Sequence, residues 1–417
     1  MQILLLNQAF YPDVVATAQY LTRLAEVLTE AGHEVRVIAS NRAYDHPERR
    51  FPDREVYRGI VIERIGGTGF GKGAAWRRIL DFGSFLMRAA LRVAVGPRGH
   101  IVVALTSPPL VAAIAAVRCR LSGERLIYWV MDLNPDEALA AGWLQPGLAA
   151  RVMEALSRFT LRTADTVVVL DRYMRDLVRS KGIPASRIEV LPPWSLDQVA
   201  YRDQDARSRF RQEHGLTGKY VVMYSGNHSP VHPLETLFCA AAALRARPEF
   251  VFLFVGGGSE YRRLREEAAS MGLQNVRFLP YQPLESLAGS LSAADLQTVV
   301  MGSSMVGTIH PSKLYNILAV GSRVLYIGPQ ESHVEDALRA RGQQGHIHLD
   351  HGDVQKLVTW LEADHAQWSE KGRFLDDPHA ADYAETTVLA RFVALLEGRA
   401  AAPAYAAADS RETPLAR

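Results

Sequence analysis

Short apolar stretches alternate with amphipathic stretches along most of the chain. The first apolar stretch, QILLL at residues 2–6, is followed by a polar loop, a helical pattern from about Thr17 to Ala31, and a second apolar stretch, EVRVIA at residues 34–39. Gly32 marks the end of the helix, because glycine commonly follows the last helical residue. Apolar stretches of this length, joined through helices by short connections, are typical of parallel strands covered by helices. The pattern therefore predicts an α/β fold.

The alternation is interrupted once, at residues 191–205, where two prolines and a polar run remove the periodicity. Further strands are predicted before this point at VIERI, HIVVAL, RLIYWV and DTVVVL, and after it at KYVVMYSG, FVFLFVG, NVRFLPY, DLQTVVM, RVLYIG and IHLD. Each group is sufficient for one doubly wound, Rossmann-like domain. We expect domains at residues 1–195 and 196–379, a helix at 380–398 that packs across both, and a disordered polar tail at 399–417.

Composition narrows the class of protein. The 417 residues can form two domains that each bury a core, and the formal net charge of +2 gives no basic field that would indicate a nucleic-acid partner. Cys119 and Cys239 lie far apart on apolar segments, so we expect reduced thiols. The first residues lack the pattern of a signal peptide, and the longest apolar run is broken by Ser107, Pro108 and Pro109. These features predict a cytoplasmic protein.

The segment at residues 299–329 predicts a strand, a polar loop, a helix and another strand. The loop contains small residues whose N–H groups and hydroxyls suit a phosphate: Gly302, Ser303, Ser304, Gly307 and Thr308. His310 and Lys313 add donors or positive charge, Pro311 fits the first helical turn, and Gly321 ends the helix. An ordinary αβ unit with a polar loop would show the same pattern.

Several motifs, in their order and spacing, resemble a known family over nearly the whole chain. They are FYPDVVATAQYLTRLAEVLTEAGHEVRVIA, LTSPPL, DLNPDEALAAG, MYSGNHSPVHPLETL, FVGGGSEYRRLREEA, NVRFLPYQP and HPSKLYNILAVG. They resemble the GT-B-fold family 4 glycosyltransferases, in the branch typified by colanic-acid and O-antigen enzymes. The resemblance implies transfer of a sugar, with retention of configuration, from a nucleotide-diphosphate donor, most simply a UDP-sugar, to a saccharide or polyprenyl-linked acceptor. It implies no obligatory metal and no further cofactor.

The resemblance also implies which residues form the site. Donor-binding positions are Asn227, His228, His232, Gly257, Tyr281, Gln282, Gly307, Thr308, Ser312 and Asn316; acceptor-binding positions are Tyr11, Asp13 and Thr17; and catalytic positions are Asp132, His310 and Lys313. The sequence departs from the family at two pairs of positions. Thr308 and Asn316 stand where many members carry two glutamates, and Asn227 and His232 stand where many carry an arginine and a lysine that grip the diphosphate. Phosphate neutralisation is therefore assigned to Lys313, a histidine and loop N–H groups.

Several of these positions have ordinary structural alternatives. Asp132 follows a buried strand, where a carboxylate faces a ligand cleft and can orient or deprotonate an acceptor hydroxyl, but it also fits a turn. Thr17 fits a helix N-cap. His228 and His232 would form a metal pair only on a continuous helix, which Pro230 and Pro233 exclude. The run Gly256 to Gly258 permits close approach of a ligand, and Tyr281 is equally explained by packing.

Three other segments bear on nucleotide binding, metal binding and membrane contact. GGTGFGKG at residues 66–73 lacks the Ser or Thr of a Walker A loop and the acidic partner of a dinucleotide loop, so we interpret it as a flexible loop. Asp203 and Asp205 are interpreted as acids at a helix start. The segment AAWRRILDFGSFLMRAALRVAV places Arg77, Arg78, Arg88 and Arg92 among aromatic and apolar residues. It predicts peripheral contact with the inner face of an anionic membrane, or simply a domain helix with a basic face.

Two other function classes stay open from the sequence alone. A sugar-nucleotide epimerase shares the predicted fold and needs no acceptor. A non-catalytic sugar-nucleotide-binding protein is the other alternative, because the glutamate pair and the basic pair are missing.

Overall fold

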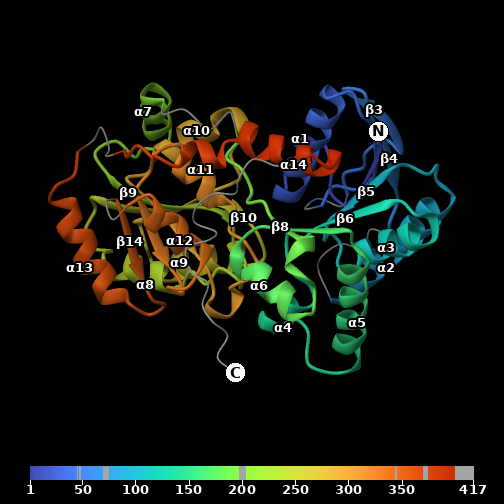
Figure 1. The fold of residues 1–417 in the computed structure, drawn as a ribbon. Helices are drawn as coiled ribbons and strands as arrows, with labels where there is room; N and C mark the ends of the chain where they lie inside the picture. The colour runs from blue at the N-terminus through green and yellow to red at the C-terminus, as the bar shows by residue number, and fades with distance from the viewer. Residues whose placement is uncertain are drawn as a thin grey trace. The chain divides into compact units, whose positions relative to one another are not determined.

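A computed structural model describes residues 1–44, 46, 48–68, 75–196, 203–342, 345–369 and 374–399 (Figure 1). Most of the loop expected at residues 66–73 and nearly all of the expected tail lie outside these ranges. The chain forms two compact units. Of the described residues, the first unit comprises Met1–Pro192, Gly307–His310 and residues 389–399, and the second comprises Pro193–Val306 and Pro311–Val388.

The first unit contains an eight-stranded sheet in the order β3-β4-β2-β1-β5-β6-β7-β8. Its strands are β1 (Gln2–Leu6), β2 (Glu34–Ser40), β3 (Arg54–Tyr57), β4 (Ile60–Ile65), β5 (Ile101–Ala104), β6 (Arg125–Trp129), β7 (Thr166–Val169) and β8 (Ile188–Val190). All neighbours pair in parallel except β3, which is antiparallel to β4. The six strands that the apolar pattern predicts are confirmed. The edge strands β3 and β8 were not predicted, because one is half polar and the other has three residues.

Helices cover both faces of this sheet. They are α1 (Ala16–Glu30), α2 (Ala75–Val95), α3 (Val111–Ser122), α4 (Asp136–Ala140), α5 (Leu148–Thr163) and α6 (Arg172–Ser180), with a 3-10 turn at Ala185–Arg187. The helix α1 connects β1 to β2 in one direction, and α3 and α5 connect β5, β6 and β7 in the other. Because such crossovers are right-handed, α3 and α5 lie on the sheet face opposite α1.

The last described helix, α14 (Glu385–Glu397), follows a 3-10 turn at Ala380–Tyr383. From Leu389 it belongs to the first unit. The ring of Phe392 packs edge-on against Trp129 of β6, with 4.7 Å between centroids. The guanidinium of Arg125 donates hydrogen bonds to the carbonyl oxygens of Leu395 and Leu396, at 2.7 and 3.0 Å. The C-terminal carbonyls of α14, which have no partners within a helix, are thus satisfied by β6.

The second unit contains a six-stranded parallel sheet in the order β11-β10-β9-β12-β13-β14. Its strands are β9 (Tyr220–Asn227), β10 (Phe250–Gly257), β11 (Val276–Leu279), β12 (Leu296–Val300), β13 (Val324–Ile327) and β14 (His346–Leu349). Its helices are α7 (Gln204–Glu213), α8 (Glu235–Ala243), α9 (Tyr261–Ser270), α10 (Leu284–Ser292), α11 (Lys313–Ala319), α12 (His333–Ala340) and α13 (Val354–His365). A 3-10 turn lies at Ser303–Met305. All six predicted strands are confirmed. Asp203 caps α7 by accepting a hydrogen bond from the Ala206 N–H at 2.8 Å, which confirms its assignment to a helix start.

A buried ion network ties α7 to this sheet. The carboxylate of Asp295 accepts hydrogen bonds from Arg207 at 2.7 Å, from Arg211 at 3.2 Å and from the Val221 N–H at 2.8 Å. Both arginines are almost completely buried. A buried guanidinium is tolerated only when its charge and its N–H groups have partners.

Replacing Asp295 by Ala should lower the free energy of unfolding by about 3–5 kcal/mol, because two buried guanidinium groups lose their counter-charge. Urea unfolding of the full chain measures the change. The control variant Asp353→Ala removes a carboxylate paired with the exposed Lys356, and it should cost less than about 1 kcal/mol. A similar loss in both variants would contradict the assigned role of Asp295.

Candidate functional site

The central feature of the second unit is the buried amino group of Lys313, the first residue of α11. Its Nζ lies 3.5 Å from the centroid of the Tyr224 ring, in cation–π geometry. The group is buried and has no hydrogen-bond partner among the described residues. Gly226 makes room for it, because a Cβ at that position would lie 2.8 Å from Nζ. Burial lowers the pKa of Lys313 well below its ordinary value. A buried amino group with a lowered pKa and no counter-ion indicates a site that an anion would complete, because a bound anion favours the charged form.

Two histidines lie close enough to Lys313 for their pKa values to respond to its charge. The Nδ1 of His232 lies 2.8 Å from the carbonyl oxygen of Val300, and that of His228 lies 3.2 Å from the carbonyl oxygen of Gly257. Burial first and the Lys313 charge second lower the pKa of His228 to about 4 and that of His232 to about 3. Both imidazoles are therefore neutral at physiological pH, and they add hydrogen-bonding capacity rather than charge.

The glycines at the end of β10 make close contacts with the protein's own backbone. A Cβ at Gly256 would lie 2.1 Å from the carbonyl oxygen of Gly226, and one at Gly258 would lie 2.3 Å from that of His228. Both residues have positive φ angles, 128° and 130°. These two glycines are therefore required by the protein's own backbone, whether or not a ligand also approaches the strand end.

Tyr281 lies over the same strand end. A Cβ at Gly257 would meet its ring at 3.1 Å, and about half of the Tyr281 side chain is exposed. Its ring thus packs on one side and remains available to a planar group on the other. The neighbouring Gln282 is partly exposed and donates its amide N–H to the Pro280 carbonyl oxygen at 2.9 Å.

Three further predicted donor positions lie in this unit. Asn227 is exposed at the end of β9, and its carbonyl oxygen accepts a hydrogen bond from the Tyr224 hydroxyl at 2.7 Å. The side-chain oxygen of Asn316 accepts from the Leu196 N–H at 3.0 Å, so it holds the incoming chain. Ser312 precedes α11 without a side-chain cap, and Pro311 lies one residue earlier. The expectation that Pro311 belongs to the first helical turn was wrong, whereas Gly321 does follow the helix end.

The sequence predicts that the segment from Gly307 to His310 lies together with Lys313. In the structure this segment belongs to the first unit instead. Gly307 has a φ of +75°, and a Cβ there would lie 3.0 Å from the Tyr173 carbonyl oxygen. The Thr308 carbonyl oxygen accepts a hydrogen bond from the Leu133 N–H at 2.8 Å. The backbone of this segment is therefore used for packing and hydrogen bonding within the first unit.

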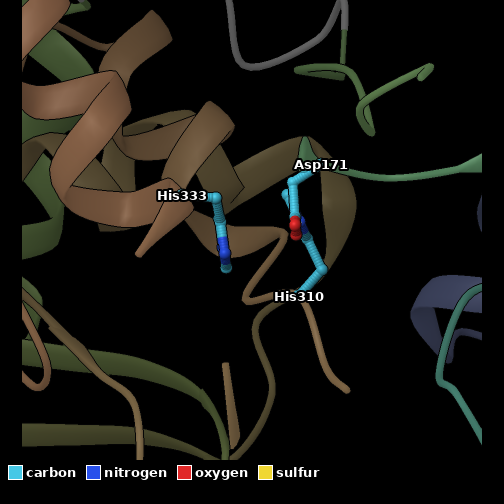
Figure 2. Close-up of side chains that lie close together, drawn as sticks. All are labelled: Asp171, His310 and His333. Carbon is cyan, nitrogen blue, oxygen red and sulfur yellow. The ribbon is translucent and has the colours of Figure 1, made fainter. Parts of the chain in front are cut away.

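Figure 2 shows the side chains of His310 and Asp171 pointing toward each other within the first unit. The His310 Nδ1 lies 2.7 Å from Oδ2 of Asp171, and Oδ1 of Asp171 accepts from the Met174 N–H at 2.8 Å as the N-cap of α6. Asp171 was not among the residues predicted from the sequence, although an aspartate before an amphipathic helix is an N-cap signal. The third labelled residue, His333, begins α12 of the second unit.

Two carboxyl groups follow β6 in the first unit. Burial raises the pKa of Asp132 to about 6. Burial and the neighbouring Asp132 charge raise the pKa of Glu137 to about 8. Asn134 donates its amide to Glu137 at 3.2 Å, and the Asp132 N–H donates to the Thr106 hydroxyl at 3.4 Å. The pair can therefore hold or release a proton near neutral pH, as general acid–base chemistry requires. Glu137 was not among the predicted site residues.

The predicted acceptor residues also lie in the first unit. The ring of Tyr11 stacks on Tyr57, with 3.8 Å between centroids. Both carboxylate oxygens of Asp13 accept from the Tyr44 N–H, at 2.9 and 3.2 Å. Thr17 lies in the first turn of α1 and is not its N-cap, because that position is Val15. The Asp13 carboxylate therefore holds a neighbouring loop in place.

The acid pair predicts a pH dependence of stability. The raised pKa values mean that the native state binds more protons than the unfolded chain between about pH 4 and 8, so stability falls as the pH rises through this range. Glu137→Gln mimics the protonated acid. Its melting temperature should equal that of the wild type at pH 4 and lie about 3 °C or more above it at pH 8. Calorimetry of both proteins and of the exposed control Glu266→Gln measures this, and equal melting at pH 8 would contradict the assigned burial.

Family models and known proteins identify the class. A glycosyl transferase 4-like domain matches residues 16–194, and glycosyl transferases group 1 matches residues 206–324. WcaI of Escherichia coli, named as a colanic acid biosynthesis glycosyl transferase, is 28% identical over 348 residues, which cover 78% of this chain and 83% of that protein.

Solved structures share the fold. Sucrose-phosphate synthase of Thermosynechococcus elongatus aligns with a TM-score of 0.72 and 16% identity over 95% of this chain and 98% of its own. HepE of Anabaena, solved with UDP and glucose, aligns with a TM-score of 0.69 and 15% identity over 95% of this chain and 99% of its own. Since the two family models together match most of the chain, it belongs to the glycosyltransferases that join a 4-like domain to a group 1 domain in the GT-B fold of two Rossmann-like domains.

Proposed function

We propose that the chain transfers a sugar from a nucleoside-diphosphate donor, most simply a UDP-sugar, to a saccharide or polyprenyl-linked acceptor in the synthesis of a cell-surface polysaccharide. The observation that carries this proposal is the buried, unpartnered amino group of Lys313. The similarity to WcaI, whose name refers to colanic acid biosynthesis, and the fold shared with HepE, which was solved with UDP and glucose, support the substrate classes.

Lys313 gives the second unit a buried amino group that would carry a positive charge once the donor diphosphate is bound. When the bond between the sugar and the phosphate breaks, negative charge grows on the departing phosphate oxygen. A buried ammonium group stabilises this charge more strongly than an exposed one would, because little water screens it. The neutral rings of His228 and His232 would direct hydrogen bonds at the same anion. Tyr281 would stack on the nucleobase, and Asn316, Ser312 and Asn227 would contact the nucleoside and sugar.

The acceptor is assigned to the first unit. Asp132, with a pKa of about 6, would accept the proton of the acceptor hydroxyl or orient it. Tyr11 and Thr17 would contact the acceptor, and Asp13 would hold the loop that follows β2. In a reaction with retention of configuration, the departing phosphate oxygen would share the task of taking the acceptor proton. His310, whose ring is oriented by Asp171, is the other residue of this unit to which we assign a catalytic role.

The enzyme would work at the cytoplasmic face of the membrane, where nucleotide sugars and lipid-linked acceptors meet. Within the described residues, no helix is both long and apolar enough to cross a bilayer. Attachment would instead use α2, whose Trp76, Met87 and Leu91 are more than half exposed on a helix that also carries arginines. The side chain of Arg78, predicted to contribute, lies outside the described part.

Lys313→Met tests the donor site and separates function from folding. Removing a buried, unpaired charge should raise the melting temperature of the free protein, while affinity for UDP should fall at least about tenfold. Sugar transfer should fall by a similar factor. Calorimetric titration with UDP, GDP and ADP measures binding, and it also identifies the donor nucleotide.

Lys356→Met is the matched control, because Lys356 is exposed and paired with Asp353. It should leave nucleotide binding unchanged. Undiminished UDP binding by Lys313→Met would remove Lys313 from the site. A product of unchanged mass, formed from the nucleotide sugar alone, would identify an epimerase and overturn the transferase proposal.

A further inference from the structure

Exposed apolar side chains are concentrated on three helices of the first unit. Of the 17 large apolar residues that are exposed in the described part of the chain, ten lie on α2, α3 and α5. On α2 they are Trp76, Leu80, Met87, Leu91 and Val95; on α3, Val117 and Leu121; and on α5, Leu148, Val152 and Leu156. Their spacings of four, seven or eight residues place them on one face of each helix.

The three helices form one surface. The helix α3 packs against α2 on one side and α5 on the other (Figure 1). The exposed residues of α3 therefore lie between the outer faces of α2 and α5. These residues are Val117, Arg120 and Leu121. Exposed apolar side chains gathered on neighbouring helices often mark an interaction surface.

A recess of about 510 Å³ opens in this surface between α3 and α5. Its lining consists of Arg120, Ala155, Arg158, Phe159, Arg162 and Thr163. The three arginines are exposed, and no acidic residue is among the described residues that line the recess. Among the residues that the structure describes, one carboxylate contacts these arginines: Glu154 accepts from Arg158 at 2.6 Å and is shared with Lys181 at 3.0 Å. The recess therefore has excess positive charge.

We propose that this recess binds the phosphate of an anionic phospholipid, with the surrounding apolar side chains inserted among the acyl chains. Guanidinium groups bind phosphate through paired N–H donors. The presence of two of these arginines also has a second explanation. Arg120 and Arg162 lie in the last turns of α3 and α5, where the helix dipole favours a cation. That explanation covers neither Arg158 nor the exposed Leu121 and Leu156 beside the arginines.

The proposal rests on the proposed function only in placing the enzyme at a membrane. It adds to the α2 contact a specific site for a lipid head group. The ligand chemistry also separates a lipid from free phosphate, because the apolar side chains contribute to binding only when acyl chains are present.

Flotation of the full chain with phosphatidylcholine vesicles, with and without phosphatidylglycerol, tests the site. The triple variant Arg120→Gln, Arg158→Gln, Arg162→Gln should bind the anionic vesicles at least about tenfold more weakly than the wild type. The control triple variant Arg245→Gln, Arg262→Gln, Arg265→Gln changes the net charge equally in the second unit, on exposed arginines. Its binding to the anionic vesicles should fall by less than about threefold.

The apolar contribution is tested separately. Leu121→Ser with Leu156→Ser should weaken vesicle binding at least about tenfold, whereas Met271→Ser, an exposed control at the end of α9, should not. Soluble glycerol phosphate should displace little of the protein from the vesicles.

Three results would overturn the proposal: equal losses in the two arginine variants, equal binding to vesicles without phosphatidylglycerol, or full displacement by glycerol phosphate, which would indicate a free phosphate site. The outcome is separable from the proposed function, because UDP binding and transfer to a water-soluble acceptor are measured without vesicles. Both should be unchanged in the arginine variant. If the wild type showed neither UDP binding nor sugar transfer, the proposed function would be overturned and the vesicle result would still stand.

Discussion

The proposed donor chemistry depends on one physical constraint, the burial of the Lys313 amino group against the ring of Tyr224 without a counter-ion. Tyr224 is completely buried in β9, and Gly226 two residues later leaves the space that Nζ occupies. A buried amino group without a hydrogen-bond partner destabilises the free protein, and under the proposed function the anion that binds there explains its presence. Under this proposal, stability is given up at this position in return for electrostatic stabilisation of a departing diphosphate.

The titratable groups of the two units are tuned in opposite directions by the same force. Burial lowers the pKa values of His228 and His232, which keeps these rings neutral beside Lys313. Burial raises the pKa values of Asp132 and Glu137, which keeps a proton available near neutral pH. Desolvation disfavours whichever form is charged. The result is an anion-binding group in one unit and a proton-handling pair in the other, which matches the needs of sugar transfer to a hydroxyl.

Much of this fold could be predicted from the sequence, because the central strands are continuous apolar runs. FVFLFVG is a short apolar run rich in valine and phenylalanine, which is typical of a buried strand, whereas β3 is half polar and β8 is too short to give a pattern. Lys313 could be singled out by its place at a helix start. The surroundings of His310 could not, since its partner Asp171 is 139 residues away and belongs to the other half of the chain. Gly256 and Gly258 suggested a ligand, but only the structure shows that neighbouring carbonyl oxygens exclude a Cβ there.

The most direct test of the central claim is the number of protons exchanged when UDP binds at pH 8, where its phosphates are fully ionised. It is obtained from the binding enthalpy in buffers of different ionisation enthalpy. We predict that the wild type takes up protons, because the anion restores the lowered pKa of Lys313, and that Lys313→Met takes up none. Tight UDP binding with no proton uptake by the wild type would contradict the claim that the diphosphate completes the Lys313 site.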